Sequence, residues 1–305
     1  MMKSYRIFSI LTALFLLTIT TKAQNTSGVD STGLPGDDFS LQGALQLFKQ
    51  AGSPEEFEKL LNTESSNVNN LDLNGDGETD YVRVIDKQDG DVHVFILQVP
   101  VSEKESQDIA VIELEKTGGS TAMIQIIGDE DIYGEEVIVE PNGDEETGMS
   151  FQSNYGMDHG PSGYTESNGI IVNVWLWPSV RFIYGPVYRP WASPWRWRMH
   201  PVWWKPWHPL AWRVFHPRCV VYHRPFVVVR THRIVRGPVI YRPVRMSSVS
   251  VRTRHSVAVN NYRVTRTKTT VTGPRGNSAI RTTTTVRGKH GKVKASKTTV
   301  RKRHR

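Results

Sequence analysis

Acidic residues are absent from the last 139 residues of this 305-residue chain. All 30 Asp and Glu lie at or before Glu166, whereas 29 of the 38 Lys and Arg follow it. The first 166 residues, which contain 9 basic side chains, have a formal net charge of −21, and the remainder has +29. This asymmetry is typical of an acidic folded domain joined to a cationic interaction segment.

Cysteine and long apolar runs are also scarce. Cys219 is the single cysteine, so the folded part has no internal disulfide and must be stabilised by hydrophobic burial or by a bound metal. Beyond the N-terminal region, apolar runs such as 170–177 end at Pro178, well short of the ~20 residues that a membrane-spanning helix needs. We therefore expect no transmembrane helix in the mature chain.

Recognisable catalytic motifs are missing too. No Gly-rich phosphate loop follows a predicted strand, no Gly-x-Ser-x-Gly sequence occurs, and Cys219 lacks papain-like surroundings. His93 lies in an apolar run, which favours a place in the core over a role as a general base. We expect a protein that is not an enzyme, and an enzyme with a concealed site is the weakest hypothesis.

The N-terminal region has the pattern of a cleavable secretory signal. Lys3 and Arg6 precede the apolar stretch 7–20, and Ala23 supplies a small residue at the cleavage position. We expect residues 1–23 to be removed and the protein to be exported to the periplasm, the cell surface or the extracellular medium. An uncleaved anchor is the alternative, because the apolar stretch is close to the length boundary.

Residues 38–141 have the pattern of an α+β domain. Leu41, Leu45 and Phe48 are spaced as on one face of an amphipathic helix, and Ser53 has the position of the N-cap of a second helix. Short β-rich runs then alternate with Asp, Gly, Asn and Ser clusters, which predicts an antiparallel meander of four or five strands. These runs are 81–85, 92–101, 109–115, 123–127 and 137–139.

The rest of the chain divides by composition. Residues 24–37 and 142–168 are polar, Gly-containing linkers. Residues 169–245 contain all nine Trp, and their Pro spacing excludes helices and central strands, so we expect an irregular-to-β segment rich in Trp, Pro and Arg. Residues 246–305 are a basic tail whose Thr and Val repeats favour β-hairpins. Because the tail has little apolar surface, we expect it to be largely disordered until it meets a partner.

One acidic loop has the spacing of a calcium site. The side chains of Asp72, Asn74 and Asp76, the backbone carbonyl of Glu78 and the carboxylate of Asp80 place oxygen ligands at positions that allow one turn to wrap a hard cation. Over about 12 residues the loop resembles the DxNxDGxxD calcium loops of dockerins, thrombospondin type 3 repeats and FG-GAP-like repeats. This resemblance implies bound Ca²⁺, and the alternative is an acidic turn that binds no metal.

The loop departs from the EF-hand pattern after its first nine positions. Position 12 is Arg83 instead of a bidentate Glu, and a strand is predicted to follow. We therefore expect a weaker site, or one that is completed from elsewhere by Asp129, Glu130 or Asp131.

Arginine alternates with aromatic residues in the Trp-rich segment. Guanidinium groups pair with phosphate or sulfate while aromatic rings stack or enter an interface, so this composition suits polyanion binding. The predicted contact residues are Arg189, Arg196, Arg198, Arg213, Arg224 and Arg242. The alternative is that these cations neutralise the chain's own acidic domain or that of a neighbour.

Three histidines recur at a spacing of eight in the same segment. His200, His208 and His216 each precede Pro, which favours extended backbone, and eight residues of such chain span about 25 Å. We expect them not to converge on one metal ion unless the chain folds back.

These patterns support two main hypotheses. The first is an exported, non-enzymatic envelope or extracellular protein, in which a calcium-stabilised acidic domain carries a cationic aromatic segment that binds anionic envelope polymers, acidic glycans or extracellular nucleic acid. The alternative is a structural or assembly protein whose acidic and basic halves pair within or between copies. The order of signal, acidic domain, Trp/Pro block and basic tail resembles exported proteins of Bacteroidota, a likeness of organisation that implies no activity.

Overall fold

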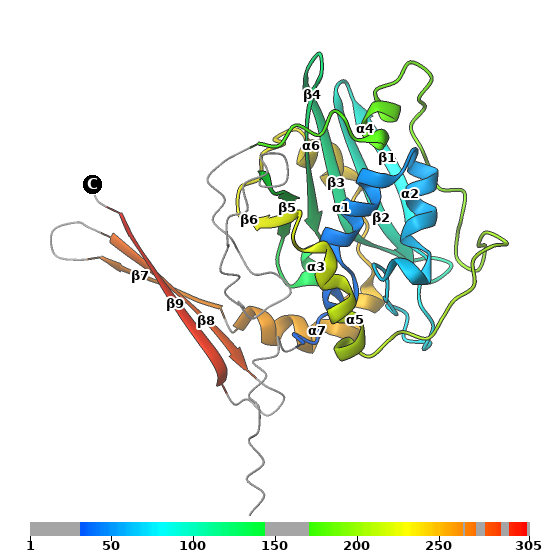
Figure 1. Ribbon diagram of the computed structural model, residues 1–305. Helices are drawn as coiled ribbons and strands as arrows, with labels where there is room; N and C mark the ends of the chain where they lie inside the picture. Colours follow the sequence, from blue (N-terminus) through cyan, green and yellow to red (C-terminus); the bar gives the residue numbers. More distant parts are fainter. Residues whose placement is uncertain (1–30, 144–170, 265, 273–277, 288–292, 304–305) are drawn as a thin grey trace, which may run out of the picture.

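The computed structural model describes residues 31–143, 171–264, 266–272, 278–287 and 293–303 (Figure 1). The predicted signal sequence, residues 24–30 of the first predicted linker and residues 144–168 of the second lie outside these ranges. The end of the first segment is not a linker, because Leu34 is buried and Pro35–Asp38 form a 3-10 turn. The described residues confirm the α+β fold class, with helices followed by an antiparallel sheet.

Two helices open the fold where the sequence predicts them. After a 3-10 turn, η1 (Pro35–Asp38), helix α1 spans Leu41–Gln50 and helix α2 spans Pro54–Leu61. The hydroxyl of Ser40 accepts from the Gly43 amide at 3.0 Å, and that of Ser53 accepts from the Glu56 amide at 3.1 Å. Both side chains therefore satisfy a backbone N–H that the first helical turn leaves unpaired.

The acidic half of the chain, up to Glu166, then forms five consecutive antiparallel strands; the residues after Glu166 are the basic half. They are β1 (Arg83–Asp89), β2 (Val92–Pro100), β3 (Ser106–Gly118), β4 (Thr121–Gly128) and β5 (Val137–Pro141), with the short helix α3 (Glu130–Tyr133) between β4 and β5. This is the predicted meander, and each observed strand overlaps the run that predicts it.

The basic half completes the sheet at both edges. Strand β6 (Phe226–Val229) pairs antiparallel with β5, in a register that places Val228 opposite Val139. At the other edge, Ala192 bridges to Ile85 of β1. Exposed edge strands invite pairing with other chains, and here a segment of the basic half covers each edge. The predicted boundary after residue 141 therefore falls between two neighbouring strands of one sheet.

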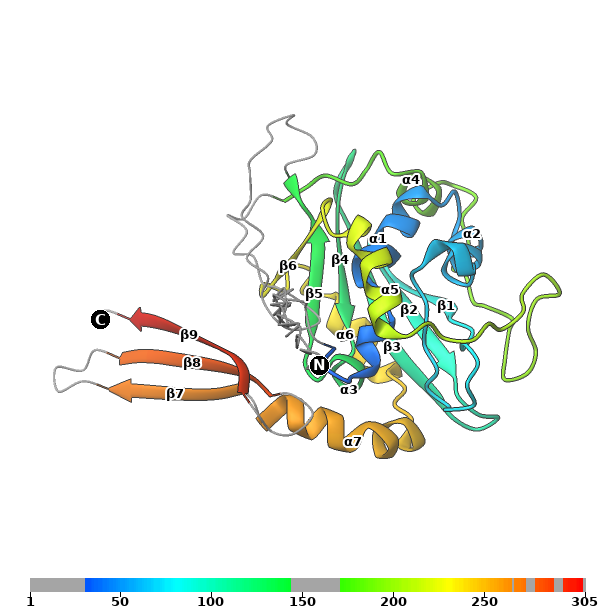
Figure 2. The ribbon, with the colours of Figure 1, turned by 60° about the horizontal axis from the view of Figure 1, so that its bottom comes forward.

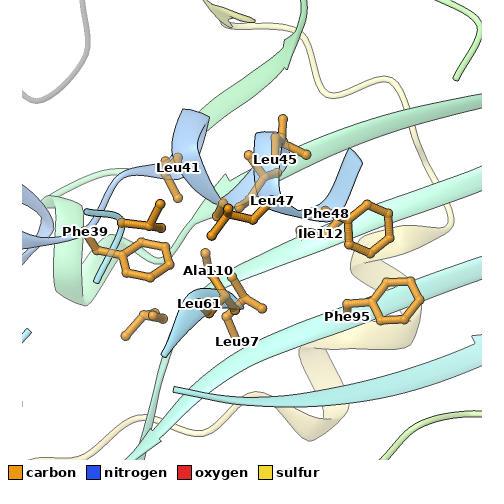
Figure 3. Packing of buried hydrophobic residues seen from close by; sticks show 14 of the residues in the cluster. Phe39, Leu41, Leu45, Leu47, Phe48, Leu61, Phe95, Leu97, Ala110 and Ile112 are labelled. Carbon is orange, nitrogen blue, oxygen red and sulfur yellow. The ribbon is translucent and has the colours of Figure 1, made fainter. Parts of the chain in front are cut away.

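A hydrophobic core fills one face of the sheet beneath α1 and α2 (Figure 3). Phe48 of α1 packs edge-on against Phe57 of α2 and Phe95 of β2, with ring centroids 5.2 Å apart in both pairs. Helix α4 (Pro178–Ile183), from the basic half, adds Val180 and Ile183 to the same core. Residues separated by more than 80 positions thus share one buried cluster.

A second apolar cluster lies on the opposite face of the sheet. Val94 and Ile96 of β2 belong to it, and Ile234 of the basic half is completely buried against them. The short helix α6 (Gly237–Tyr241) contributes Ile240 and Tyr241, which pack on the edge of this cluster. Strand β2 is therefore buried on both faces, which is typical of a strand with an almost continuous apolar sequence.

The prediction that Pro excludes helices from the Trp-rich segment was wrong. Helices α4 and α6 carry Pro at their first turn, where no backbone hydrogen bond is lost. Helix α5 (Trp212–Cys219) contains Pro217, and the one-turn elements η4 (Val220–Tyr222) and η5 (Arg242–Val244) follow α5 and α6. All are short, so Pro limits helix length here instead of preventing helices. The expected absence of central strands holds, because β6 is at the sheet edge.

The tail begins with a long helix and continues as a separate sheet. Helix α7 (Val249–Val264) packs beside α3, and β7 (Arg266–Thr272), β8 (Ser278–Arg287) and β9 (Val293–Arg303) form a three-stranded antiparallel sheet that projects from the main body (Figure 2). The Thr- and Val-rich repeats form these strands, as their composition favours. Within the described residues, no helix combines the length and the apolar character that crossing a membrane requires.

Candidate functional site

The face of the sheet opposite α1 and α2 carries buried carboxylates that pair with cations of the basic half. His232 Nε2 lies 2.5 Å from Glu113 Oε2, whose side chain is 1 % exposed. Arg233 donates to both carboxylate oxygens of Glu140, at 2.8 and 2.9 Å. Gln125 connects the two chain segments, because its side chain donates to Glu140 and accepts from the Arg233 amide. Charge-assisted bonds of this kind offset the desolvation of the buried carboxylates.

Close approach of the backbone is part of this arrangement. A Cβ at Gly237 would lie 2.1 Å from the carboxyl carbon of Glu113, so any larger residue at the start of α6 would displace this carboxylate. Burial raises the pKa of Glu113, and the bond to His232 acts in the opposite direction. The same bond raises the pKa of His232 and so favours the imidazolium form of its ring.

A second acid–base cluster joins the end of β4 to the segment before α7. Arg245 donates to both oxygens of Asp129, at 2.6 and 2.8 Å, and to Asp131 at 3.0 Å. Nearby, Asp108 accepts from the Met246 amide at 2.8 Å and from the Tyr241 hydroxyl at 3.2 Å. Burial raises the pKa of Asp108 to about 6. Of the three carboxylates suggested to complete the calcium loop, Asp129, Glu130 and Asp131, the first and the last are thus engaged by Arg245.

Glu58 of α2 connects several chain segments on the face of the sheet that α1 and α2 cover. Its buried carboxylate accepts from the Tyr81 hydroxyl at 2.9 Å, the Val84 amide at 2.9 Å, the Trp191 indole at 3.0 Å and the Ser193 hydroxyl at 2.8 Å. Burial raises the pKa of Glu58, and these donors oppose the rise. Glu58 therefore ties the Trp-rich segment to α2 and β1.

His93 lies in the core, as its apolar surroundings predict. Its Nδ1 is 2.9 Å from Asp86 Oδ2, and the same oxygen accepts from the Tyr188 hydroxyl at 2.7 Å. Both the His93 and the Asp86 side chains are almost fully buried, which leaves them out of reach of a substrate in solution.

The predicted calcium loop is closed by hydrogen bonds to its own backbone. Asp72 accepts from the amides of Gly75, Asp76 and Gly77, and Asp80 accepts from the amide of Leu73 at 2.5 Å. Burial, together with the charges of Asp72 and Asp76, raises the pKa of Asp80 to about 7. The carboxylates thus crowd one another, a repulsion that a bound cation would relieve.

Three observations bear on metal binding by this loop. Within the described part of the chain, no group of three or more His, Cys, Asp or Glu side chains is arranged to hold a metal ion. The guanidinium of Arg254, from α7, lies against Gly75 and donates to the Leu73 carbonyl. Among the predicted ligands, Asn74 donates to the carboxylates of both Asp76 and Asp80, at 2.9 and 3.1 Å, and the Glu78 amide donates to Asp76. Calcium binding would require Asn74 to turn its oxygen inward.

The three repeated histidines lie in different surroundings. His200 stacks on Tyr81 at a centroid distance of 5.7 Å, His208 Nδ1 is 2.9 Å from the Gly77 carbonyl, and His216 stacks on Trp212 at 4.7 Å. Each ring thus has a different contact: an aromatic ring for His200 and His216, and a backbone carbonyl for His208.

The six arginines predicted to bind polyanions are exposed. Arg196 and Arg198 belong to a tight turn in which the amide and carbonyl of Arg196 pair with those of Met199, and Arg198 at its tip has a φ of 58°. The Arg198 guanidinium lies 5.7 Å from the Trp197 ring centroid. Within the described residues, no ion pair involves any of the six. They are distributed over the loop before α5, α5 itself, and the segments before β6 and after α6.

No family model matches this chain, and neither a curated protein nor a solved structure matches it. What the molecule does must therefore be inferred from its own chemistry.

Sequence patterns do not distinguish the cations that pair inside the fold from those that stay exposed. His232, Arg233 and Arg245 lie in the same basic segment as the six predicted arginines and have similar neighbours in sequence. The acidic half does indicate that such cations are needed, because Glu113 and Glu140 occupy positions within strongly apolar strands. A buried carboxylate needs a partner, so charges at such positions indicate that cations from elsewhere must reach them.

Proposed function

We propose that the chain is an exported, non-enzymatic envelope or extracellular protein that attaches to anionic polymers through its basic half. The single observation that carries this proposal is the division of the cations into two groups. His232, Arg233 and Arg245 are paired with buried carboxylates, whereas the six exposed arginines form no ion pair among the described residues. Cations that the fold does not neutralise are available to an external polyanion.

The apolar surface has the same distribution and supports the same proposal. All the large apolar side chains that the described structure exposes belong to the basic half, from Ile171 to Val257. Trp203 is 47 % exposed and Val202 is fully exposed, on the loop that follows the Arg196–Met199 turn. Guanidinium groups can pair with the anionic groups of acidic glycans or phosphate polymers, and the exposed aromatic and aliphatic side chains beside them can enter the same interface.

The projecting tail adds to this cationic surface. Strands β7, β8 and β9 contain nine Lys or Arg and no acidic residue. In the register of this sheet, every Lys or Arg that has a cross-strand partner lies opposite a Thr, a Ser or an apolar residue. No two of these basic residues are therefore directly opposite each other. This spacing limits repulsion between like charges across the strands.

Pairing of acidic and basic halves between copies is the weaker alternative. The buried carboxylates Glu113, Asp129 and Glu140 already pair with cations of their own chain, so they are not available to the basic half of another copy. Calcium stabilisation remains part of the proposal, supported by the mutual repulsion of the carboxylates around Asp80.

A salt series tests the proposal. Binding of the full chain to heparin and to a phosphate polymer should weaken steeply as salt rises, since bound counterions are released on docking. The double variant Arg196→Gln, Arg198→Gln should flatten the slope of log K against log salt, by up to about 0.7–0.9 for each arginine that pairs with the polymer. The matched control is Lys87→Gln, Lys104→Gln, which removes two exposed cations from the acidic half. Binding that is insensitive to salt, or equal effects of the two double variants, would contradict the proposal.

A further inference from the structure

A cavity of about 400 Å³ opens between the first turn of α2 and the Trp-rich segment. Its aromatic walls are Tyr81, Trp191, Trp195 and Trp203. The acidic half supplies α2 and Tyr81, and the basic half supplies the three Trp, so the cavity exists only when the two halves are folded together. Its volume lies in the range of small-molecule sites, about 300–1,000 Å³.

Hydrogen bonds hold the aromatic walls in place. The Trp191 indole and the Tyr81 hydroxyl both donate to Glu58, which is 2 % exposed. Tyr81 also packs edge-on against Trp204 at a centroid distance of 5.2 Å. Two walls are therefore fixed before any ligand arrives, which reduces the entropy that binding must overcome.

The charges around the cavity select the class of ligand. Three carboxylates line it, those of Glu55, Glu56 and Glu58, against the single cation of Lys59. Lys59 Nζ lies 5.7 Å from the ring centroid of Trp203, a distance at which an aromatic ring attracts a cation. An anion would be repelled by the carboxylates.

We propose that this cavity binds an organic ammonium cation with apolar substituents, held against the faces of Trp195 and Trp203 beside the carboxylate of Glu55. Alkylated ammonium groups combine positive charge with an apolar surface, and aromatic walls recognise them by cation–π attraction. This proposal does not depend on polyanion binding, because the ligand has the opposite charge and the cavity lies next to the acidic first turn of α2, although Trp203 borders both surfaces.

Titration of the full-length protein with choline and with benzyltrimethylammonium tests the proposal. Both should give saturable changes in Trp fluorescence. The uncharged isostere of choline, 3,3-dimethylbutan-1-ol, should bind at least about tenfold more weakly, because it lacks the charge that the rings attract. Equal binding of the isostere, no binding of either cation, or binding of a neutral disaccharide in their place would overturn the proposal.

Variants locate the site. Trp203→Leu, at a half-exposed position, should weaken choline binding at least fivefold, and Glu55→Gln should weaken it severalfold. Lys59→Met should strengthen binding, since it removes the internal cation that competes for Trp203, and a misfolded protein would not show such a gain. The matched control is Trp212→Leu, whose ring stacks on His216 on α5 and does not line the cavity. Effects of Trp203→Leu and Trp212→Leu that are equal, or a loss with Lys59→Met, would place the binding elsewhere.

Discussion

Arg245 offers the sharpest test of whether the basic half is an integral part of the fold. Replacing Arg245 by Gln leaves the Asp129 carboxylate, 3 % exposed, without its bidentate cation. Removing one partner of a buried ion pair costs ~3–5 kcal/mol. The Arg245 side chain is 28 % exposed, so we expect a smaller loss of about 2–3 kcal/mol in the free energy of unfolding. For a folded body of this size, that loss lowers the melting temperature by roughly 4–12 °C.

Urea unfolding followed by two probes makes the measurement. All nine Trp lie between Trp175 and Trp212, so their fluorescence reports on the basic half, whereas far-ultraviolet circular dichroism follows the helices and the sheet. If the two halves share one core, both probes should show the same transition. The matched control is Arg213→Gln, which removes an exposed arginine from α5 and should change stability by less than about 0.5 kcal/mol.

A double-variant cycle isolates the Arg245 pair. Asp129→Asn in the Arg245→Gln background removes the buried charge, so the combined loss should be smaller than the sum of the two single losses. A loss for Arg245→Gln no greater than that for Arg213→Gln would refute the reasoning. So would a Trp transition that precedes the loss of the sheet, because the basic half would then unfold by itself.

Three further predictions concern the loop, the thiol and pH. Calcium should raise the melting temperature of the full chain, since a ligand that binds only the folded loop stabilises the folded state. Asp76→Ala should remove most of this gain, and the control Asp91→Ala should not. Equal melting temperatures in calcium and in chelator would contradict the calcium site. Cys219 should be a free thiol that reagents label slowly in the native protein and completely in denaturant, because its side chain is buried and burial raises its pKa to about 12; a thiol that stays blocked in denaturant would be inconsistent with this. The hydrogen bond that the His232 ring donates to Glu113 raises the pKa of His232 above 6.5, so the folded state holds this proton more tightly than the unfolded state. Its contribution to stability should therefore be complete below pH 6.5 and decline as the pH rises through the raised pKa, and His232→Gln should flatten that part of a pH series of urea unfolding midpoints.

Local patterns account for the parts of the fold that the sequence predicts well. The N-caps Ser40 and Ser53 act on amides three residues away, and the apolar face of α1 repeats every three or four residues. The strands from β1 to β5 are joined by short connections, so their pairing follows chain order. These features depend on neighbours in sequence, and composition and period are sufficient to locate them.

The basic half shows where local patterns are insufficient. Strand β6 is only four residues long and joins the sheet because β5, more than 80 positions earlier, presents an open edge. The same holds for α4, which is helical for six residues and buries Val180 in a core built mainly by the acidic half. Propensity is a weak guide for such short segments, because tertiary contacts decide their conformation.

The charge asymmetry is the property that the amino-acid sequence determined by itself: an acidic half and a basic half follow from composition alone, as does the expectation that the cations must meet anions. Which cations meet the chain's own carboxylates was decided only by the tertiary structure. Arg233 and Arg245 lie more than 90 residues from Glu140 and Asp129, and exposed arginines such as Arg242 occur between them in sequence. The physical reason is that a buried carboxylate, deprived of water, requires a cation in fixed geometry, and only the folded chain specifies which side chain reaches it.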